Sequence, residues 1–192
     1  MNQKSKGNIS GIYKNAIDQG HTVGLQVNPN RDYDDMDADE IDDDVARQLD
    51  AIKNLTDTDV KYAKGPVTDG EPNADLYNVL AQNDITMPYY NFFPYDHDDP
   101  MGEFESTIRT SNPKYDSFMV LLHDKQEADT PYLREIVELG RENGYEFVNM
   151  DQCLGDYKPE DGGDGFKPKD KTAGVQSIGA TFLPLLVVLV HL

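Results

Sequence analysis

The sequence predicts an α/β fold in which helices alternate with the strands of a parallel sheet, open or closed into a barrel. Three observations indicate this class. Apolar residues recur at helical spacing in several segments, and short apolar runs of strand length stand between them. Two of the helical patterns are followed by a glycine, Gly20 and Gly144, where helices commonly end. Because each strand would be joined to the next by a helix, parallel pairing is favoured.

Helices and strands alternate through the first part of the chain. The predicted elements are a short helix that ends at Gly20, a strand at 21–27, a helix that reaches about residue 53, a strand at 60–63, a helix at 73–82 and a strand at 85–90. A polar loop precedes the second helix, and Asp37 is the predicted N-cap of that helix. The charge run Asp42-Asp43-Asp44 is expected to lie mostly on its exposed face.

The second part of the chain continues the alternation. The predicted elements are an aromatic loop at 91–100, a helix at 102–109, a strand at 117–122, a helix at 131–143 and a strand at 145–149 that ends the folded part. The run at 117–122, SFMVLL, is continuous and apolar, as in a strand that is buried on both faces. The expected organisation is a domain at 1–155, a disordered polar stalk at 156–177 and an apolar tail at 178–192.

The charge balance excludes some classes of partner. Among 192 residues, 17 are basic and 36 are acidic, which gives a net charge of −19. Such a chain is poorly suited to nucleic acid or to an anionic membrane surface. A single cysteine, Cys153, excludes an intrachain disulfide framework and is expected to be a buried small hydrophobe.

The apolar tail suggests a removable lipid-anchor signal. Small residues at 162–165 are followed by a polar spacer at 166–177 and by the tail, IGATFLPLLVVLVHL. This order is typical of a glycosylphosphatidylinositol (GPI) signal, and the tail is shorter than the roughly 20 residues of a comfortable bilayer span. Gly163 is the predicted attachment residue, because Gly165 supplies a second small position. The alternative is a tail helix that packs on the domain.

A GPI signal implies passage through the secretory pathway to the cell surface. Two N-glycosylation sequons, at Asn8 and Asn54, fit that route, although such short motifs also arise by chance. The first residues, MNQKSKGNISG, contain no apolar run and do not form a signal peptide. The expectation is therefore that residues are missing upstream, by truncation or by a faulty gene model.

Several short motifs occur in an order that resembles a known family. They are GH at 20–21, KYAKGP at 61–66, LLHD at 121–124, GYEFV at 144–148 and CLG at 153–155. Together they resemble the NodB-homology polysaccharide deacetylases, in particular fungal chitin deacetylases, over about residues 10–155. The resemblance implies a distorted (β/α) barrel that here lacks its first strand. It also implies removal of N-acetyl groups from chitin-like sugars, with a divalent metal, usually zinc, that polarises the acetamide and activates a water.

Most of the family's catalytic residues have no match in this chain. The family's T-F-D-D-G segment, which supplies a metal ligand and the general base, is absent. The positions of its two metal-binding histidines hold Gln26 and Asn30, whose neutral amides bind zinc poorly. Lys64 stands in place of an arginine and lacks the fork geometry that orients the base. His123 matches the general acid, although a strand-end histidine with a structural role is an alternative.

Aromatic residues of the 91–100 region and its approach are candidates for a sugar-binding groove. The chain contains no tryptophan, which the family uses in its pocket, so the groove is predicted from Tyr89, Tyr90, Phe92, Phe93 and Tyr95. His97 lies among aspartates and is a weaker candidate for binding a metal, because its loop has no recognised ligand spacing.

Three hypotheses about function remain open. The first is a degenerate, non-catalytic deacetylase-like protein of the cell surface that binds chitin or a related wall polysaccharide as a monomer, with no cofactor. The second is an active metal-dependent chitin deacetylase, with zinc, whose missing motif lies upstream. The third is a truncated relic without independent function, since a barrel that lacks a strand has an exposed edge.

Overall fold

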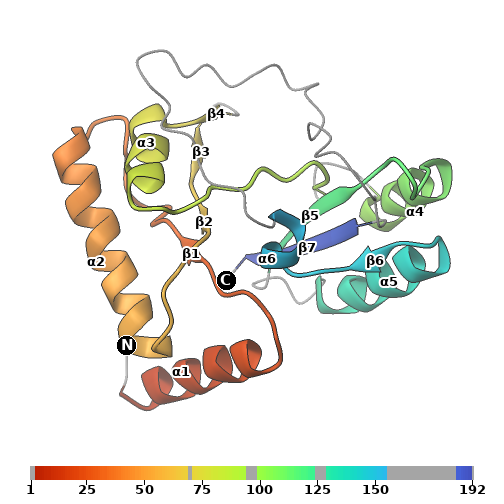
Figure 1. Ribbon diagram of the computed structural model, residues 1–192, viewed down its shortest axis with the longest axis horizontal. Coiled ribbons are helices and arrows are strands. Elements are labelled where there is room, and N and C mark those ends of the chain that lie inside the picture. Colours follow the sequence, from red (N-terminus) through yellow and green to blue (C-terminus); the bar gives the residue numbers. More distant parts are fainter. Residues whose placement is uncertain (1–2, 69–70, 94–98, 124–128, 155–184, 192) are drawn as a thin grey trace. The chain divides into compact units, whose positions relative to one another are not determined.

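The fold was analysed in a computed structural model, which describes residues 3–68, 71–93, 99–123, 129–154 and 185–191 (Figure 1). The described chain divides into two compact units. The first contains the described residues up to Pro88, and the second contains those from Tyr89 onward. Helices and strands are mixed in both units, as the sequence predicts.

The described residues of the first unit form three helices and four short strands. In chain order they are α1 (Gln3–Asp18), β1 (Leu25–Gln26), α2 (Ala38–Thr56), β2 (Ala63–Lys64), β3 (Val67–Thr68), β4 (Glu71–Pro72) and α3 (Ala74–Gln82). β1 pairs with β2 in parallel, and a parallel bridge joins Tyr62 to Thr86. β3 and β4 form an antiparallel pair between the strand predicted at 60–63 and the helix predicted at 73–82.

The apolar faces of α2 and α3 form the core of the first unit with the residues of β1 and β2. Ile41 and Val45 of α2 and Leu76 and Leu80 of α3 are fully buried. α2 begins with a capping box, in which the side chains of Asp37 and Glu40 each accept a hydrogen bond from the other's backbone N–H. The predicted N-cap Asp37 is therefore confirmed.

In the second unit, the part of the chain that the structure describes forms three helices and a three-stranded sheet. Its elements are α4 (Pro100–Thr110), β5 (Phe118–His123), α5 (Asp129–Glu142), β6 (Glu146–Phe147), α6 (Met150–Leu154) and β7 (Leu185–His191). The strand order is β5-β7-β6, and both pairings are parallel. The core consists of one face of each long helix packed on this sheet, and its fully buried side chains include Phe104, Ile108, Val120 and Ile136.

Several predicted strands are shorter in the structure than in the sequence analysis. The strand expected at 21–27 is β1, Leu25–Gln26, and the one at 85–90 is reduced to the bridge at Thr86. The strand at 145–149 is β6, Glu146–Phe147, and it does not end the folded part, because α6 follows. At Gly24, just before β1, a Cβ would lie 2.8 Å from the carbonyl oxygen of Tyr62, so the backbones approach too closely for a side chain.

The apolar tail contributes a strand rather than a helix. β7 lies within the predicted tail and forms the middle strand of the second unit's sheet (Figure 1). The predicted stalk, residues 156–177, lies outside the described residues. Within the described part of the chain, no helix is both long enough and apolar enough to cross a bilayer. The described strands form three sheets, so the closed barrel stays a prediction.

Candidate functional site

The carboxyl ends of β1 and β2 bring two predicted site residues together. Gln26 and Lys64 are the last residues of the two strands and are direct partners in the parallel register. The backbone N–H of Val27 then donates to the carbonyl of Lys64 over 2.9 Å. In parallel α/β folds, ligands bind beyond this end of the strands. The edge is therefore the candidate site of the first unit.

The loop that follows β1 carries Asn30 and turns back on itself. The side chain of Asn28 accepts a hydrogen bond from the backbone N–H of Asn30 over 3.0 Å. The backbone N–H of Asn28 in turn donates to Oε1 of Gln48, on α2, over 2.9 Å. Asn30 itself is exposed, so its amide lies at the surface beside the strand ends.

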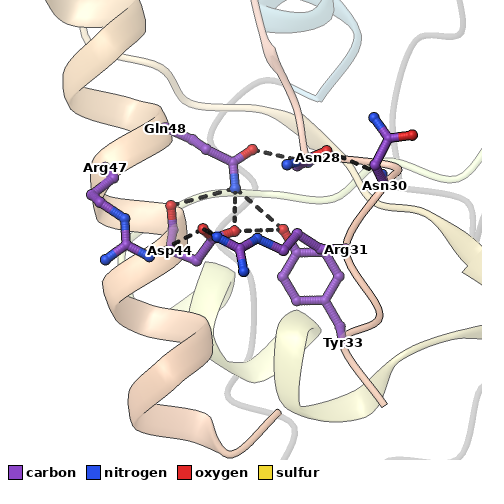
Figure 2. A network of polar contacts seen from close by, with 7 residues as sticks. All are labelled: Asn28, Asn30, Arg31, Tyr33, Asp44, Arg47 and Gln48. Carbon is purple, nitrogen blue, oxygen red and sulfur yellow. Dashed lines mark hydrogen bonds and ion pairs between the residues drawn. The ribbon is translucent and has the colours of Figure 1, made fainter. Parts of the chain in front are cut away.

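A buried polar network on α2 fixes this loop (Figure 2). Nε2 of Gln48 donates to Oδ2 of Asp44 over 2.8 Å, and the hydroxyl of Tyr33 donates to the same oxygen over 2.9 Å. The guanidinium groups of Arg31 and Arg47 lie 3.3 and 3.1 Å from Oδ1 of Asp44. Because Arg31 and Tyr33 belong to the loop, the carboxylate connects the loop to the helix from both of its oxygens.

The contacts within the network determine the protonation states of Asp44 and Tyr33. Burial alone would raise the pKa of Asp44, but the hydrogen bond from Tyr33 and the two guanidinium groups outweigh it and hold the pKa below its usual range. Burial, with the help of the nearby carboxylate, raises the pKa of Tyr33 to about 12. Asp44 is therefore an ionised acceptor and Tyr33 a protonated donor.

Asp42 and Asp43 are exposed, as expected for a run that lies mostly on the exposed face of the helix, and Asp44 is the exception. Asp44 is only 4% exposed. It follows Ile41 by three positions, and Gln48 follows it by four, so all three share one face of the helix. The helical spacing that identified the buried apolar residues therefore also predicts that Asp44 lies on the buried face.

Lys64 is the cationic member of the site. Its side chain is half-buried, and burial lowers the pKa of its ammonium group. The Nζ atom lies 3.5 Å from the carbonyl oxygen of Gly65, and no carboxylate in the described part of the chain forms an ion pair with it. A partly desolvated ammonium without a carboxylate partner is a donor suited to a neutral polar ligand.

The donor set at this edge does not fit the zinc that the family resemblance implies. Amide oxygens are weak zinc ligands, and the ammonium group of Lys64, the register partner of Gln26, repels a divalent cation. Among the residues that the structure describes, no group of three or more histidine, cysteine, aspartate or glutamate side chains could hold a metal ion. His97 lies outside those residues.

Aromatic side chains meet near the start of the second unit. The rings of Tyr89 and Tyr90 are stacked, with centroids 5.5 Å apart and an interplanar angle of 3°. Phe93 lies next to Tyr90 at 5.8 Å. Tyr89 is 66% exposed, whereas Tyr90 and Phe93 are partly buried. These three residues form a surface, called here the tyrosine stack.

Phe92 does not belong to the tyrosine stack, which corrects one member of the predicted groove. It is 8% exposed, forms a bridge with Val120 and packs edge-on against Phe104 with centroids 5.3 Å apart. Tyr95, the fifth predicted member, lies outside the described residues.

His123 is the last residue of β5 and is opposite His191 in the register with β7. The backbone thus places it at a strand's carboxyl end, where the resemblance implies the general acid. Cys153 is half-buried, and burial raises the pKa of its thiol, which fits a packing role better than a reactive one.

Both glycosylation sequons lie in helices. Asn8 is in α1 and Asn54, which is exposed, is in α2. The hydroxyl of Ser10, in the first sequon, donates over 2.5 Å to the carbonyl of Leu55, in the second. Thr56 is buried and donates to the carbonyl of Ile52. Glycosylation at either site stays a prediction, and Gly163 lies outside the described residues.

Comparison with known proteins agrees with the fold described above. No family model matches the chain. A solved structure described as T48 deacetylase with substrate matches at a TM-score of 0.64 and 20% identity, over 80% of this chain and 75% of that one. A family 4 carbohydrate esterase from Streptomyces lividans, solved in complex with acetate, matches at a TM-score of 0.56 and 15% identity, over 71% of this chain and 69% of that one.

A third match is the carbohydrate esterase (CE) family 4 pseudoenzyme BA3943 from Bacillus anthracis. It matches at a TM-score of 0.60 and 17% identity, over 74% of this chain and 50% of that one, so this chain spans about half of its length. A mutant described as having restored enzymatic activity matches equally well. These solved structures confirm the predicted resemblance at the level of the fold, which is that of the CE4 polysaccharide deacetylases.

Proposed function

We propose that this protein is a non-catalytic member of the deacetylase-like fold that binds an N-acetylated wall polysaccharide such as chitin. The proposal combines a site that keeps polar donors but not metal ligands with an exposed aromatic surface. In this proposal the protein binds the polysaccharide as a deacetylase does but does not hydrolyse its acetamide groups.

The pairing of Gln26 with Lys64 is the observation that carries the proposal. The resemblance implies a metal-binding histidine and an arginine at these positions, and the chain offers a carboxamide and an ammonium group in direct register. An amide both donates and accepts, and an ammonium group donates up to three hydrogen bonds. Such groups suit the hydroxyl and acetamide groups of a sugar, but they do not activate a water for hydrolysis.

The tyrosine stack supports binding of a carbohydrate. A sugar ring presents an apolar face of C–H groups that packs on an aromatic ring, while its hydroxyl groups stay at the edge in water. Tyr89 is exposed and is backed by the parallel ring of Tyr90, so its free face is held in a fixed orientation. A flat, preoriented ring loses little entropy on binding.

A non-catalytic role has a precedent among the structural neighbours, because BA3943 is described as a pseudoenzyme. The placement of His123 at the end of β5 supports the second candidate, an active metal-dependent deacetylase. That candidate needs metal ligands and a general base in addition to His123. We take the protein to act as a monomer, whereas its attachment to the cell surface by a lipid anchor stays a prediction from the sequence and is no part of this proposal.

Binding to insoluble chitin tests the proposal directly. The full chain is incubated with chitin and with cellulose, and the bound fraction is measured against protein concentration. We expect saturable retention on chitin and about tenfold weaker binding for Tyr89→Ala, which corresponds to about 1.4 kcal/mol of lost stacking energy.

Tyr115→Ala is the matched control, because Tyr115 is 69% exposed, lies in the same unit and has the Lys114 ammonium nitrogen 5.1 Å from the centroid of its ring. It should bind as the unmodified chain does. Equal losses in the two variants, or no retention of the unmodified chain, would contradict the proposed function.

A further inference from the structure

The sheet of the second unit has an unusual order. β5 and β6 follow each other in sequence, joined by α5, and strands joined in this way are usually neighbours. Here β7 lies between them, paired with β5 from Phe118↔Leu186 to His123↔His191 and with β6 at Glu146↔Leu185 and Phe147↔Leu186 (Figure 1). β5 and β6 therefore leave a slot that is one strand wide.

The sequence of β7 suits that slot. Its residues, LLVVLVH, are apolar and rich in β-branched valine, and none is an acid, lysine or arginine. A middle strand of a parallel sheet has neighbours on both edges and is typically a continuous apolar run. The neighbouring β5 has the same character, and its Val120, Leu121 and Leu122 are buried.

The same seven residues lie within the segment that resembles a removable anchor signal, residues 178–192. The two roles exclude each other. Cleavage at a residue upstream of the tail would remove β7, and it would leave hydrogen-bonding groups of β5 and β6 without the partners that β7 supplies.

We propose that residues 185–191 are an integral strand of the folded second unit, and that this pairing withdraws them from use as an anchor signal. Once the sheet has formed, the segment is retained in the protein. Anchor attachment would then be restricted to chains in which the sheet has not yet formed. This proposal does not depend on polysaccharide binding.

Disulfide trapping in the full chain tests the register. In a Cys153→Ser background, Met119→Cys is combined with Val187→Cys, its direct partner in the register. Partners on adjacent strands lie about 5 Å apart, which is within the range of a disulfide. In the control, Met119→Cys is combined with Val190→Cys, displaced by three positions or about 10 Å along the strand.

We expect the matched pair to cross-link at least tenfold faster than the control under mild oxidation. A tail that moves freely would cross-link both pairs at similar rates, and a tail held elsewhere would cross-link neither. Either result would overturn the proposal.

A proline variant gives a second readout that does not require a disulfide. Val188→Pro removes a backbone donor in the middle of β7, and Val188→Thr keeps the donor and the β-branched shape. The proline variant should melt at least about 5 °C below the threonine variant. Equal melting temperatures would show that the tail is not part of the sheet.

Discussion

At the scale of single residues, the buried carboxylate of Asp44 determines how the candidate site is held. It receives hydrogen bonds from Tyr33 and Gln48 and ion pairs from Arg31 and Arg47, so both of its oxygens are satisfied. A buried charge is tolerated only when it is paired in this way. The network thereby orders the loop after β1.

Replacement of Asp44 should destabilise the chain far more than replacement of its neighbour. Asp44→Asn removes the charge that pairs with two arginines and turns a double acceptor into a mixed donor and acceptor. We expect a loss of about 1–3 kcal/mol in the free energy of unfolding. Asp43→Asn, at an exposed position of the same run, should change it by less than about 0.5 kcal/mol. Urea unfolding of both variants measures the difference.

The same carboxylate predicts a dependence of stability on pH. The pKa of Asp44 is lower in the folded chain than in the unfolded chain, so the unfolded chain binds more protons there at acid pH. Its contribution is fully present above about pH 4 and is lost as the pH falls through the folded pKa. The stability of Asp44→Asn should therefore vary less with pH in this range than that of Asp43→Asn. Parallel curves would contradict the assigned ionisation.

At the scale of secondary-structure elements, two glycines, one inside α1 and one just after it, differ in backbone conformation but not in the space available to a side chain. Gly11 lies inside α1, and Gly20 follows the helix with a φ of +87°. A Cβ at either position would have no atom within 4 Å. Only the backbone conformation distinguishes them.

We therefore expect alanine to have opposite effects at the two glycines. Gly11→Ala should stabilise the chain by about 0.5–1 kcal/mol, because alanine favours a helix. Gly20→Ala should destabilise it by about 1 kcal/mol or more, because an L-residue at positive φ is strained. Thermal unfolding of the two variants is sufficient, and shifts of the same sign would contradict the backbone assigned to this region.

The helices could be predicted from sequence far better than the strands. α2, α3, α4 and α5 each carry a sustained apolar face with a recognisable cap or stop, so their positions are close to those expected. Most strands have only two paired residues, too few for a periodic signal to show. β7 was hidden for another reason: an uninterrupted apolar run at the end of a chain fits a buried strand and an anchor signal equally well.

At the scale of the whole molecule, the sequence resemblance and the fold agree while the catalytic residues do not. The fold could be predicted from weak motifs in a fixed order, and solved CE4 structures match it at TM-scores of 0.56 to 0.64. That Gln26 and Asn30 stand where the family has its metal-binding histidines is what the resemblance implies, and it stays a prediction from the sequence. The direct pairing of Gln26 with Lys64 depends on the register of two strands, which no local pattern specifies.

The central claim is that this fold binds its polysaccharide without hydrolysing it, and one measurement tests that claim most directly. The full chain is incubated with chitin oligosaccharides and zinc, and bound zinc, bound sugar and released acetate are measured in the same sample. We expect bound sugar with neither stoichiometric zinc nor released acetate. One zinc per chain together with acetate release would contradict it, and would mean that the full chain assembles a metal site that Gln26, Asn30 and Lys64 do not provide.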